Sequence, residues 1–349
     1  MAIMILSWTH AWPLAAAILI IVVRYVWLSR RKATVGSKDK HHDIVSLPHF
    51  DVAATEPHPY RPWKSGKFVM TMGIQKVEES DWLAIDNRYL PEQAFRRDLL
   101  ATKRHNVLQV LPGSEAACAE VLEVVVNYVT QRYPTLFYSP AGKNDYVHNS
   151  LTGRTFKVTY PYELEPLEIA AQLVMEDLNV LIQGFAASYS MAPAGWHLEE
   201  RIGWPLWKIH TPVPLWKDKL RASVEKFFTR MQPGDIVSRH NFFVQADDVL
   251  FQADPFPATL AAPPTIESLR IRHERQTLRR LPKTGVILFT VRTYLTPLTD
   301  LEDDPESMQE FLGAIRAFPE SIARYKNRHL WGETVETWCE EKLEKASAE

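Results

Sequence analysis

The feature that most constrains the fold is a pair of β-rich runs that follow each other near the C-terminus. Residues 268–295 read SLRIRHERQTLRRLPKTGVILFTVRTYL, and the connection LPKTG places Gly285 where a tight turn needs a glycine. The sequence therefore predicts two strands joined by a hairpin. The fold must accordingly include an antiparallel sheet.

Other segments supply further strands. Two short runs are rich in β-forming residues, KFVMTMGI (67–74) and RTFKVTY (154–160). A third run, DIVSRHNFFVQ (235–245), alternates and so places Arg239 and Asn241 on the same side of a strand. Together with the hairpin, these runs predict about five strands, mostly antiparallel.

Helical periodicity appears between the strands. It covers residues 80–133, with an interruption at LPG (111–113), and residues 167–182, 214–231 and 306–325. The combination predicts an α+β fold in which helices pack on the sheet. Neither G-x-G-x-x-G after a strand nor G-x-x-x-x-G-K-[ST] occurs, so no motif indicates a nucleotide-binding fold.

The N-terminus predicts a membrane anchor. Residues 3–23 carry no charge, and at about 1.5 Å per residue a helix of that length spans roughly 30 Å, the thickness of a bilayer's hydrocarbon core. The basic residues 30–32 follow the apolar run, which predicts a single-pass protein whose main domain faces the cytosol. The alternatives are a cleaved signal peptide, although no basic region precedes the run, and an interfacial or buried helix.

The rest of the chain divides by composition. We expect an anchor with its basic flank, a polar and proline-containing linker, one main domain and a C-terminal helical tail. The expected boundaries are residues 1–32, 33–55, 56–330 and 331–349.

Charge and cysteine content limit the partners and cofactors. The net charge is −2, and no basic-aromatic motif indicates nucleic-acid binding. The two cysteines, Cys118 and Cys339, are too few for an iron–sulfur centre held by four thiolates or for a Cys-rich zinc site. Any cofactor must therefore be held by histidine, by carboxylates or by non-covalent packing.

Charged residues occur where burial is predicted. On the helix expected at 167–182, Glu176 lies within the apolar stripe and Asp177 lies at its edge. Buried carboxylates need partners. The strand RIRHERQTLRR supplies arginines and places Arg275 on the opposite face from Gln276. These groups form either a structural ion-pair network or the polar lining of a cavity for a charged substrate or cofactor.

One histidine lies in a restricted segment, LWKIHTPVPLWKD (206–218). His210 ends an apolar run, and Pro212 and Pro214 disfavour helical backbone for the residues before them. The helix must therefore stop, and the direction of the imidazole is fixed. This arrangement suits an axial metal ligand and equally suits a simple turn.

Several segments share their order with a known family. They are YRPWKSGKFVMTMGIQKVEESDWLAIDNRY, LPGSEAA, VMEDLNVL, IGWPLWKIHTPVP, RHNF and RHERQTLRRLPKTGVILFTVRTY. Each segment alone is weakly specific. In this order, over residues 59–326, they resemble the haem-dependent oxidative N-demethylase alpha-subunit family.

The resemblance implies a PAS-like fold that binds haem through a histidine axial ligand. We assign this ligand to His210 and expect a b-type, non-covalently bound haem that Arg239 and Asn241 help to bind. His240, in the alternating strand, and His197, in a Trp-rich loop, are the alternative ligands.

The family chemistry is reductive activation of O2 at the haem, which oxidises an N-methyl or C–H group of a small molecule. A histidine ligand donates less electron density than a thiolate, so nearby donors and charges must assist O–O cleavage. The expected catalytic residues are Glu176, Asp177, Arg275 and Gln276. The family motif RxNW appears here as RHNF, so Phe242 replaces a tryptophan, which would alter substrate choice if this ring lines the pocket.

The chain has only two cysteines and neither nucleotide-binding motif, so the electrons must come from another protein. The resemblance therefore implies a separate reductase that delivers electrons from NAD(P)H. The anchor would place both proteins on one membrane, which we expect to be the endoplasmic reticulum, and the substrate is then expected to be a secondary metabolite. The alternative function is a non-catalytic haem-binding PAS-like sensor or carrier.

Overall fold

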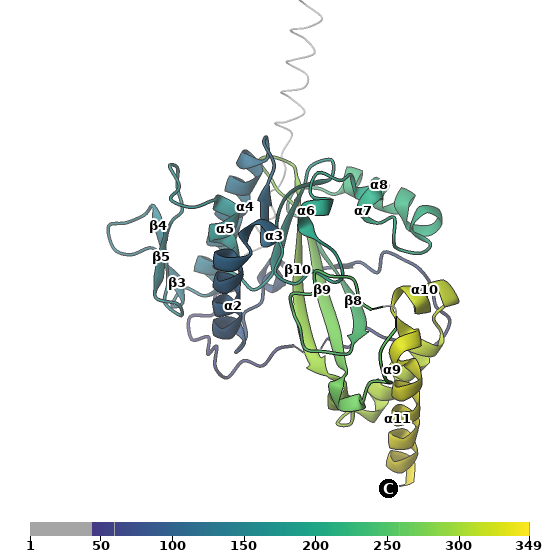
Figure 1. Ribbon diagram of the computed structural model, residues 1–349. Helices are drawn as coiled ribbons and strands as arrows, with labels where there is room; N and C mark the ends of the chain where they lie inside the picture. The colour runs from purple at the N-terminus through teal and green to yellow at the C-terminus, as the bar shows by residue number, and fades with distance from the viewer. Residues whose placement is uncertain (1–43, 59, 258, 349) are drawn as a thin grey trace, which may run out of the picture. The chain divides into compact units, whose positions relative to one another are not determined.

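A seven-stranded sheet forms the centre of the computed structural model, which describes residues 44–58, 60–257 and 259–348 (Figure 1). Its strand order is β1-β8-β9-β10-β6-β7-β2, and every neighbouring pair is antiparallel. The strands are β1 (Gln75–Lys76), β2 (Leu108–Val110), β6 (Asp177–Leu181), β7 (Phe185–Tyr189), β8 (Ile236–Gln245), β9 (Arg270–Arg280) and β10 (Ile287–Pro297).

The predicted hairpin is confirmed. β9 and β10 pair over their full lengths, from Arg270 opposite Pro297 to Arg280 opposite Ile287. In the turn, Gly285 adopts a φ of 70°, a conformation that glycine reaches without steric cost. The strand predicted at 235–245 is β8, which pairs with β9 along its whole length.

Helices cover both faces of the sheet (Figure 1). They are α2 (Tyr89–Thr102), α3 (Arg104–Val107), α4 (Glu115–Arg132), α5 (Pro166–Ala171), α6 (Leu198–Arg201), α7 (Leu206–Ile209), α8 (Arg221–Arg230), α9 (Pro305–Arg316), α10 (Glu320–Tyr325) and α11 (Arg328–Ala348). The α+β class with helices on a large antiparallel sheet is therefore confirmed.

Two apolar layers fix the faces of the sheet. On the face that α2, α4 and α5 cover, which we call the α4 face, Val180 and Leu288 join the largest hydrophobic core. On the face that α7 and α8 cover, which we call the α8 face, Leu278 packs with Phe227 and Phe228. Because side chains alternate along a strand, each strand contributes to both layers.

A further core lies where α9 and α11 meet the sheet. It buries Phe311 of α9, Trp331 and Val335 of α11, and Ile271 of β9. The C-terminal helix thus packs against the same sheet that carries the hairpin.

The helix predicted at 167–182 is wrong. Only Pro166–Ala171 is helical, as α5, and Asp177–Leu181 is the strand β6. Every residue of β6 is buried, because the strand lies between β10 and β7 and both of its faces are covered. A strand buried on both faces shows no alternation, so its sequence cannot be told from a buried helix by periodicity alone.

Other boundaries also differ from the predictions. The first helix begins at Tyr89 and not near residue 80, because residues 79–81 form a single 3-10 turn. The run 67–74 is not a strand. Its Met70 and Met72 instead pack against the cluster around Trp216. The main sheet has seven strands instead of about five. A separate three-stranded sheet contains β3 (Phe137–Tyr138), β4 (Tyr146–Asn149) and β5 (Arg154–Lys157).

The predicted anchor, residues 1–32, lies outside the described residues, as does the first part of the linker, residues 33–43. Within residues 44–58, 60–257 and 259–348, no helix combines the length and apolarity that crossing a membrane requires. The single-pass anchor therefore stays a prediction.

Candidate functional site

His210 ends the single helical turn α7, whose Ile209 packs on the α8 face of the sheet. Its Nδ1 lies 2.9 Å from the carbonyl oxygen of Leu206. A carbonyl only accepts hydrogen bonds, so we assign the proton to Nδ1 and the lone pair to Nε2. The ring stacks on Trp216, with centroids 4.1 Å apart and planes 14° apart. The imidazole is thus fixed in direction, and Nε2 is able to ligate.

The protonation state of His210 also suits ligation. Burial lowers the pKa of the imidazole, the hydrogen bond to Leu206 opposes this, and the charges of Arg239 and Arg201 lower the pKa further. The ring is therefore neutral at pH 7, the form in which histidine binds metals.

The segment after His210 has an unusual backbone. Leu215 has a φ of 64°, and Trp216–Leu220 forms a π-helix. A left-handed conformation costs a non-glycine residue about 1–2 kcal/mol, and π-helical turns are frequent at functional sites. This strained turn brings Trp216 back against His210, so the strain positions the imidazole.

A glycine anchors this segment to the sheet. Gly184, in the turn between β6 and β7, forms an antiparallel bridge with Pro205, which caps α7. A Cβ on Gly184 would lie 2.1 Å from the carbonyl oxygen of Trp204, far closer than any real contact. Only glycine lets the turn between β6 and β7 come this close to Trp204 and Pro205. This contact fixes where α7, the turn that carries His210, begins.

A row of polar side chains extends across the α8 face. Arg239 donates to Gln276 Oε1 at 3.0 Å, and Gln276 Nε2 donates to Glu274 Oε2 at 2.9 Å. Asn241 Nδ2 lies 3.4 Å from the same Glu274 oxygen, and Lys326 donates to Asn241 Oδ1 at 3.2 Å. Strand register explains the row, because Arg239 pairs with Gln276 and Asn241 pairs with Glu274.

Lys326, the residue after α10, ends this polar row inside an aromatic enclosure. Its Nζ lies 4.3 Å from the ring centroid of Phe243, 4.9 Å from that of Phe242 and 5.7 Å from that of Phe318. Burial lowers the pKa of Lys326 to about 7, and Glu274 opposes the shift. This amine therefore gains and loses a proton near neutral pH.

The match to known proteins decides the family. A family model described as haem-dependent oxidative N-demethylase, alpha subunit-like, matches residues 73–336, which is more than half of the chain and includes His210, the polar row and Lys326. The chain belongs to the haem-dependent oxidative N-demethylase alpha subunit-like family. The resemblance seen in the ordered sequence segments is thereby confirmed.

The side chains of the α8 face fit the chemistry of the haem that the demethylase family's name implies. His210 offers a neutral Nε2 that would hold the iron, and the porphyrin would supply the remaining nitrogen donors, so no cluster of protein ligands is needed. Arg239, Arg272 and Lys326 all lie near one carboxylate, Glu274, which leaves an excess positive charge. Such an excess fits the carboxylates of haem propionates. Thr293, in register with Glu274, has a buried hydroxyl without a partner among the described residues.

Two of the predicted catalytic residues of this demethylase-family protein lie away from the row. Arg275 faces the α4 side and donates to the carbonyl oxygens of Trp82, at 2.8 Å, and Asp81. Glu176 accepts from the backbone N–H of Ala84 at 3.0 Å, and burial raises the pKa of its carboxyl. Both groups have backbone partners that hold the 81–84 segment onto the sheet.

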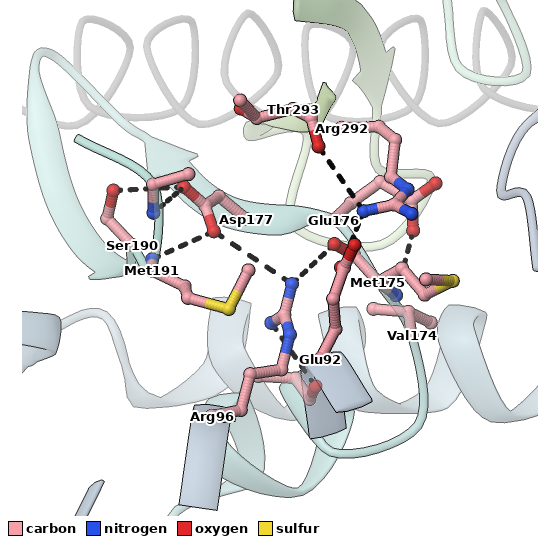
Figure 2. A network of polar contacts seen from close by, with 12 residues as sticks. Glu92, Arg96, Val174, Met175, Glu176, Asp177, Ser190, Met191, Arg292 and Thr293 are labelled. Atoms are coloured by element: carbon pink, nitrogen blue, oxygen red, sulfur yellow. Dashed lines mark hydrogen bonds and ion pairs between the residues drawn. The ribbon is translucent and has the colours of Figure 1, made fainter. Parts of the chain in front are cut away.

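Asp177 belongs to a second buried polar network, shown in Figure 2. It opens β6, not a helix, and its carboxylate accepts from the backbone N–H groups of Met191, at 2.8 Å, and Ala192, at 3.1 Å. Arg96 of α2 reaches Asp177 at 4.0 Å, while Arg292 enters the same region from β10 (Figure 2). Burial raises the pKa of Asp177, which Arg96 opposes.

The alternative ligands differ in environment from His210. His240 alternates onto the α4 face, where its ring lies 4.6 Å from that of Tyr60, and burial lowers its pKa to about 4. Its Nδ1 is buried without a partner among the described residues, so no carbonyl fixes its tautomer. His197 lies before α6 and faces Asp254 at 3.3 Å.

Phe242, the departure from the family motif, lies on the opposite face of β8 from Arg239 and Asn241, and its ring meets the polar row only at Lys326. Its ring packs against Trp63 at 5.5 Å and Phe311 at 5.9 Å, in the core with α9. Alternation along β8 places it on the opposite face from Arg239 and Asn241.

A cavity of about 330 Å³ lies at the end of β10, beside Glu92 of α2, and neither His210 nor the polar row lines it. That volume is in the range of small-molecule sites. Its lining includes Thr293, which belongs to the α8 face, and the charged residues Arg88, Asp248 and Arg270. A small polar molecule would fit this chemistry.

Sequence reasoning missed three residues of the site. Glu274 carried a signal, since it alternates with Gln276 in the same strand. Trp216 carried a weak one, since it follows the paired prolines after His210. Lys326 carried none, because it lies 85 residues from Asn241 and only the fold brings them together.

Proposed function

We propose that this protein is a haem-dependent monooxygenase that oxidises an N-methyl or C–H group of a small molecule, with His210 as the axial ligand of a b-type haem. The observation that carries the proposal is the neutral imidazole of His210, held by Leu206 and Trp216 with Nε2 able to ligate. Membership of the demethylase family supports the haem and the oxidative chemistry.

The strand arrangement supports a PAS-like core. The five consecutive strands β6 to β10 lie in the order β7-β6-β10-β9-β8, so the first and last are neighbours at the centre. The helical segment between β7 and β8 crosses one face and carries His210. A cofactor between this segment and the sheet would meet the polar row.

The side chains of the α8 face have distinct roles in this proposal. Bound haem would supply the reductive activation of O2. Arg239 pairs with a carboxylate of the cofactor. Asn241 and Gln276 hold Arg239 in place through the hydrogen bonds of the polar row. Lys326 holds or releases a proton at Nζ, next to Asn241. Glu176 and Arg275 support the site from the α4 side, and Asp177 supports it from the start of β6.

The reaction balances with an external electron source. One oxygen atom of O2 enters a C–H bond of the N-methyl group, and the other leaves as water after uptake of two electrons and two protons. The resulting carbinolamine breaks its C–N bond to give the amine and formaldehyde. We propose that a separate reductase supplies the electrons from NAD(P)H.

We also propose a location. The uncharged residues 3–23 and the basic residues 30–32 would anchor the protein in the endoplasmic reticulum membrane with the catalytic domain in the cytosol. An apolar secondary metabolite would then reach the enzyme from the membrane.

Absorption spectra of the purified full-length protein test the assignment. We expect a Soret band in the wild type that shifts with dithionite and CO, and its loss in His210→Ala. His240→Ala is the matched control, since His240 is another neutral, partly buried histidine of the same domain, and it should keep the band.

A Soret band that survives in His210→Ala and disappears in His240→Ala would reject the ligand assignment. Formaldehyde or a hydroxylated product, formed with an added reductase, would identify an oxygenase. Haem binding without turnover of amines or metabolites would favour the alternative, a sensor or carrier.

A further inference from the structure

The segment that carries His210 is charged oppositely to the protein as a whole. Residues 201–230 contain seven lysines and arginines but only two acidic residues, a net charge of +5 in a chain whose total is −2. Lys208, Lys217 and Lys219 are all exposed. One of the acids, Glu225, already pairs with Arg221 at 2.9 Å. The segment therefore presents an excess of positive charge to solvent.

The same segment exposes a large aromatic ring. Trp207 is 48% exposed although it lies in α7, whose neighbours are packed on the sheet. Nearby, the ammonium of Lys208 lies 3.9 Å from the ring centroid of Trp204. Tryptophan is enriched in the core of protein interfaces, so an exposed tryptophan in this segment suits a docking surface.

The basic surface lies next to the imidazole. Lys208 is two residues before His210, and Lys217 directly follows Trp216, the ring that stacks on His210. We propose that this surface, formed by Trp207, Lys208, Lys217 and Lys219, docks an acidic electron-transfer protein. This inference rests on the proposed function, because only a redox-active group held by His210 needs an electron donor at this place.

The chemistry of the partner follows from the surface. It should be a flavin or iron–sulfur protein whose cofactor is surrounded by Asp and Glu side chains, so that opposite charges guide the encounter. An anionic membrane would also attract lysines, but it has no reason to contact the residues that flank the imidazole. The position beside His210 thus favours the electron donor.

Charge reversal in the full-length protein tests the surface. The test variant is Lys208→Glu/Lys217→Glu/Lys219→Glu, and the matched control is Lys67→Glu/Lys143→Glu/Lys345→Glu, which changes three exposed lysines elsewhere by the same charge. The probe is an acidic [2Fe–2S] ferredoxin, with the Kd measured by biolayer interferometry at low and high salt. Circular dichroism and the Soret band are recorded for every preparation.

We expect the test variant to bind ferredoxin at least about tenfold more weakly than the wild type at low salt, with a smaller salt dependence. The control should match the wild type. Trp207→Ala should weaken binding while leaving the salt dependence unchanged, because it removes apolar contact and not charge.

Equal binding by the test variant and the control would overturn the proposal, and so would the absence of salt-dependent binding by the wild type. If the test variant loses binding to phosphatidylserine vesicles but binds ferredoxin like the wild type, the surface contacts a membrane and the proposal is overturned. Ferredoxin binding is measured without turnover, so this test does not depend on catalysis. A missing Soret band would reject the proposed function and leave the binding result to be judged separately.

Discussion

Arg292→Met removes the cation at the centre of the buried network on the α4 face (Figure 2). The Arg292 side chain is 1% exposed, and its two terminal nitrogens lie 3.0 Å from Asp86 and 2.5 Å from Glu92. These contacts join the central strand β10 to α2 and to the loop before it. Methionine fills part of the same space without replacing either ion pair.

The expected loss of stability follows from burial. Asp86 is 3% exposed, so the variant leaves a carboxylate in the interior without its cation. Breaking a buried ion pair in this way costs about 3–5 kcal/mol, whereas domains are stable by about 5–15 kcal/mol in total. We therefore expect Arg292→Met to lose about a fifth or more of the free energy of unfolding.

Urea denaturation followed by far-UV circular dichroism at pH 7 measures this loss. With a slope near 3 kcal/mol per molar urea, the midpoint should fall by about 1–1.5 M. Arg316→Met is the control, because Arg316 pairs with Glu336 and Glu340 at the surface and is 42% exposed. Exposed pairs contribute about 0–1 kcal/mol, so its midpoint should change little.

A double variant separates the lost pair from the stranded charge. Arg292→Met/Asp86→Asn removes the buried charge with the cation, and it should recover part of the lost stability. A midpoint for Arg292→Met no lower than that of Arg316→Met would refute the reasoning. A double variant less stable than the single one would show that the charge of Asp86 is not the cause.

Two further predictions concern the α8 face. The folded pKa of Lys326, about 7, lies below that of an unfolded lysine, so only the unfolded chain keeps this proton between about pH 7 and 10.5. The free energy of unfolding of the wild type should therefore rise from pH 7 to 9.5, by at most about 1.4 kcal/mol per pH unit. Lys326→Met should lack this rise, and urea midpoints measured across the pH range compare the two proteins. Gly184→Ala forces a Cβ against the Trp204 carbonyl and should cost about 1–3 kcal/mol and weaken the Soret band, whereas Gly153→Ala, with open space around it, should keep the band.

The sequence predicts the long strands of this fold better than the short, fully buried strand β6. β8, β9 and β10 are long, and Gly285 punctuates the hairpin, so alternation and turn chemistry reveal them. β6 carries no such signal, because all five of its residues are buried and its apolar run suits helix and strand alike. The position of β6 depends on its pairing with β10, a contact more than 100 residues away in the chain.

The sequence also predicts part of the candidate site, but not the contacts that depend on the fold. Pro212 and Pro214 indicate that His210 is fixed, and alternation places Arg239 and Asn241 together. The same patterns could not reveal the Leu206 carbonyl that sets the tautomer of His210, since this depends on the turn of α7. Nor could they place Lys326, which reaches Asn241 only after α10 packs at the edge of the sheet.

The two faces of the sheet use their charged residues differently, and this contrast is the strongest reason to place function on one of them. On the α2 side of the sheet, Arg292 has two carboxylates and Arg96 faces Asp177, so these two cations meet anions within the protein. On the α8 face, Arg239, Arg272 and Lys326 all lie near Glu274. A buried excess of positive charge is costly unless an anion completes it. The neutral imidazole of His210 borders this face, so one cofactor with an iron and two carboxylates would satisfy both features.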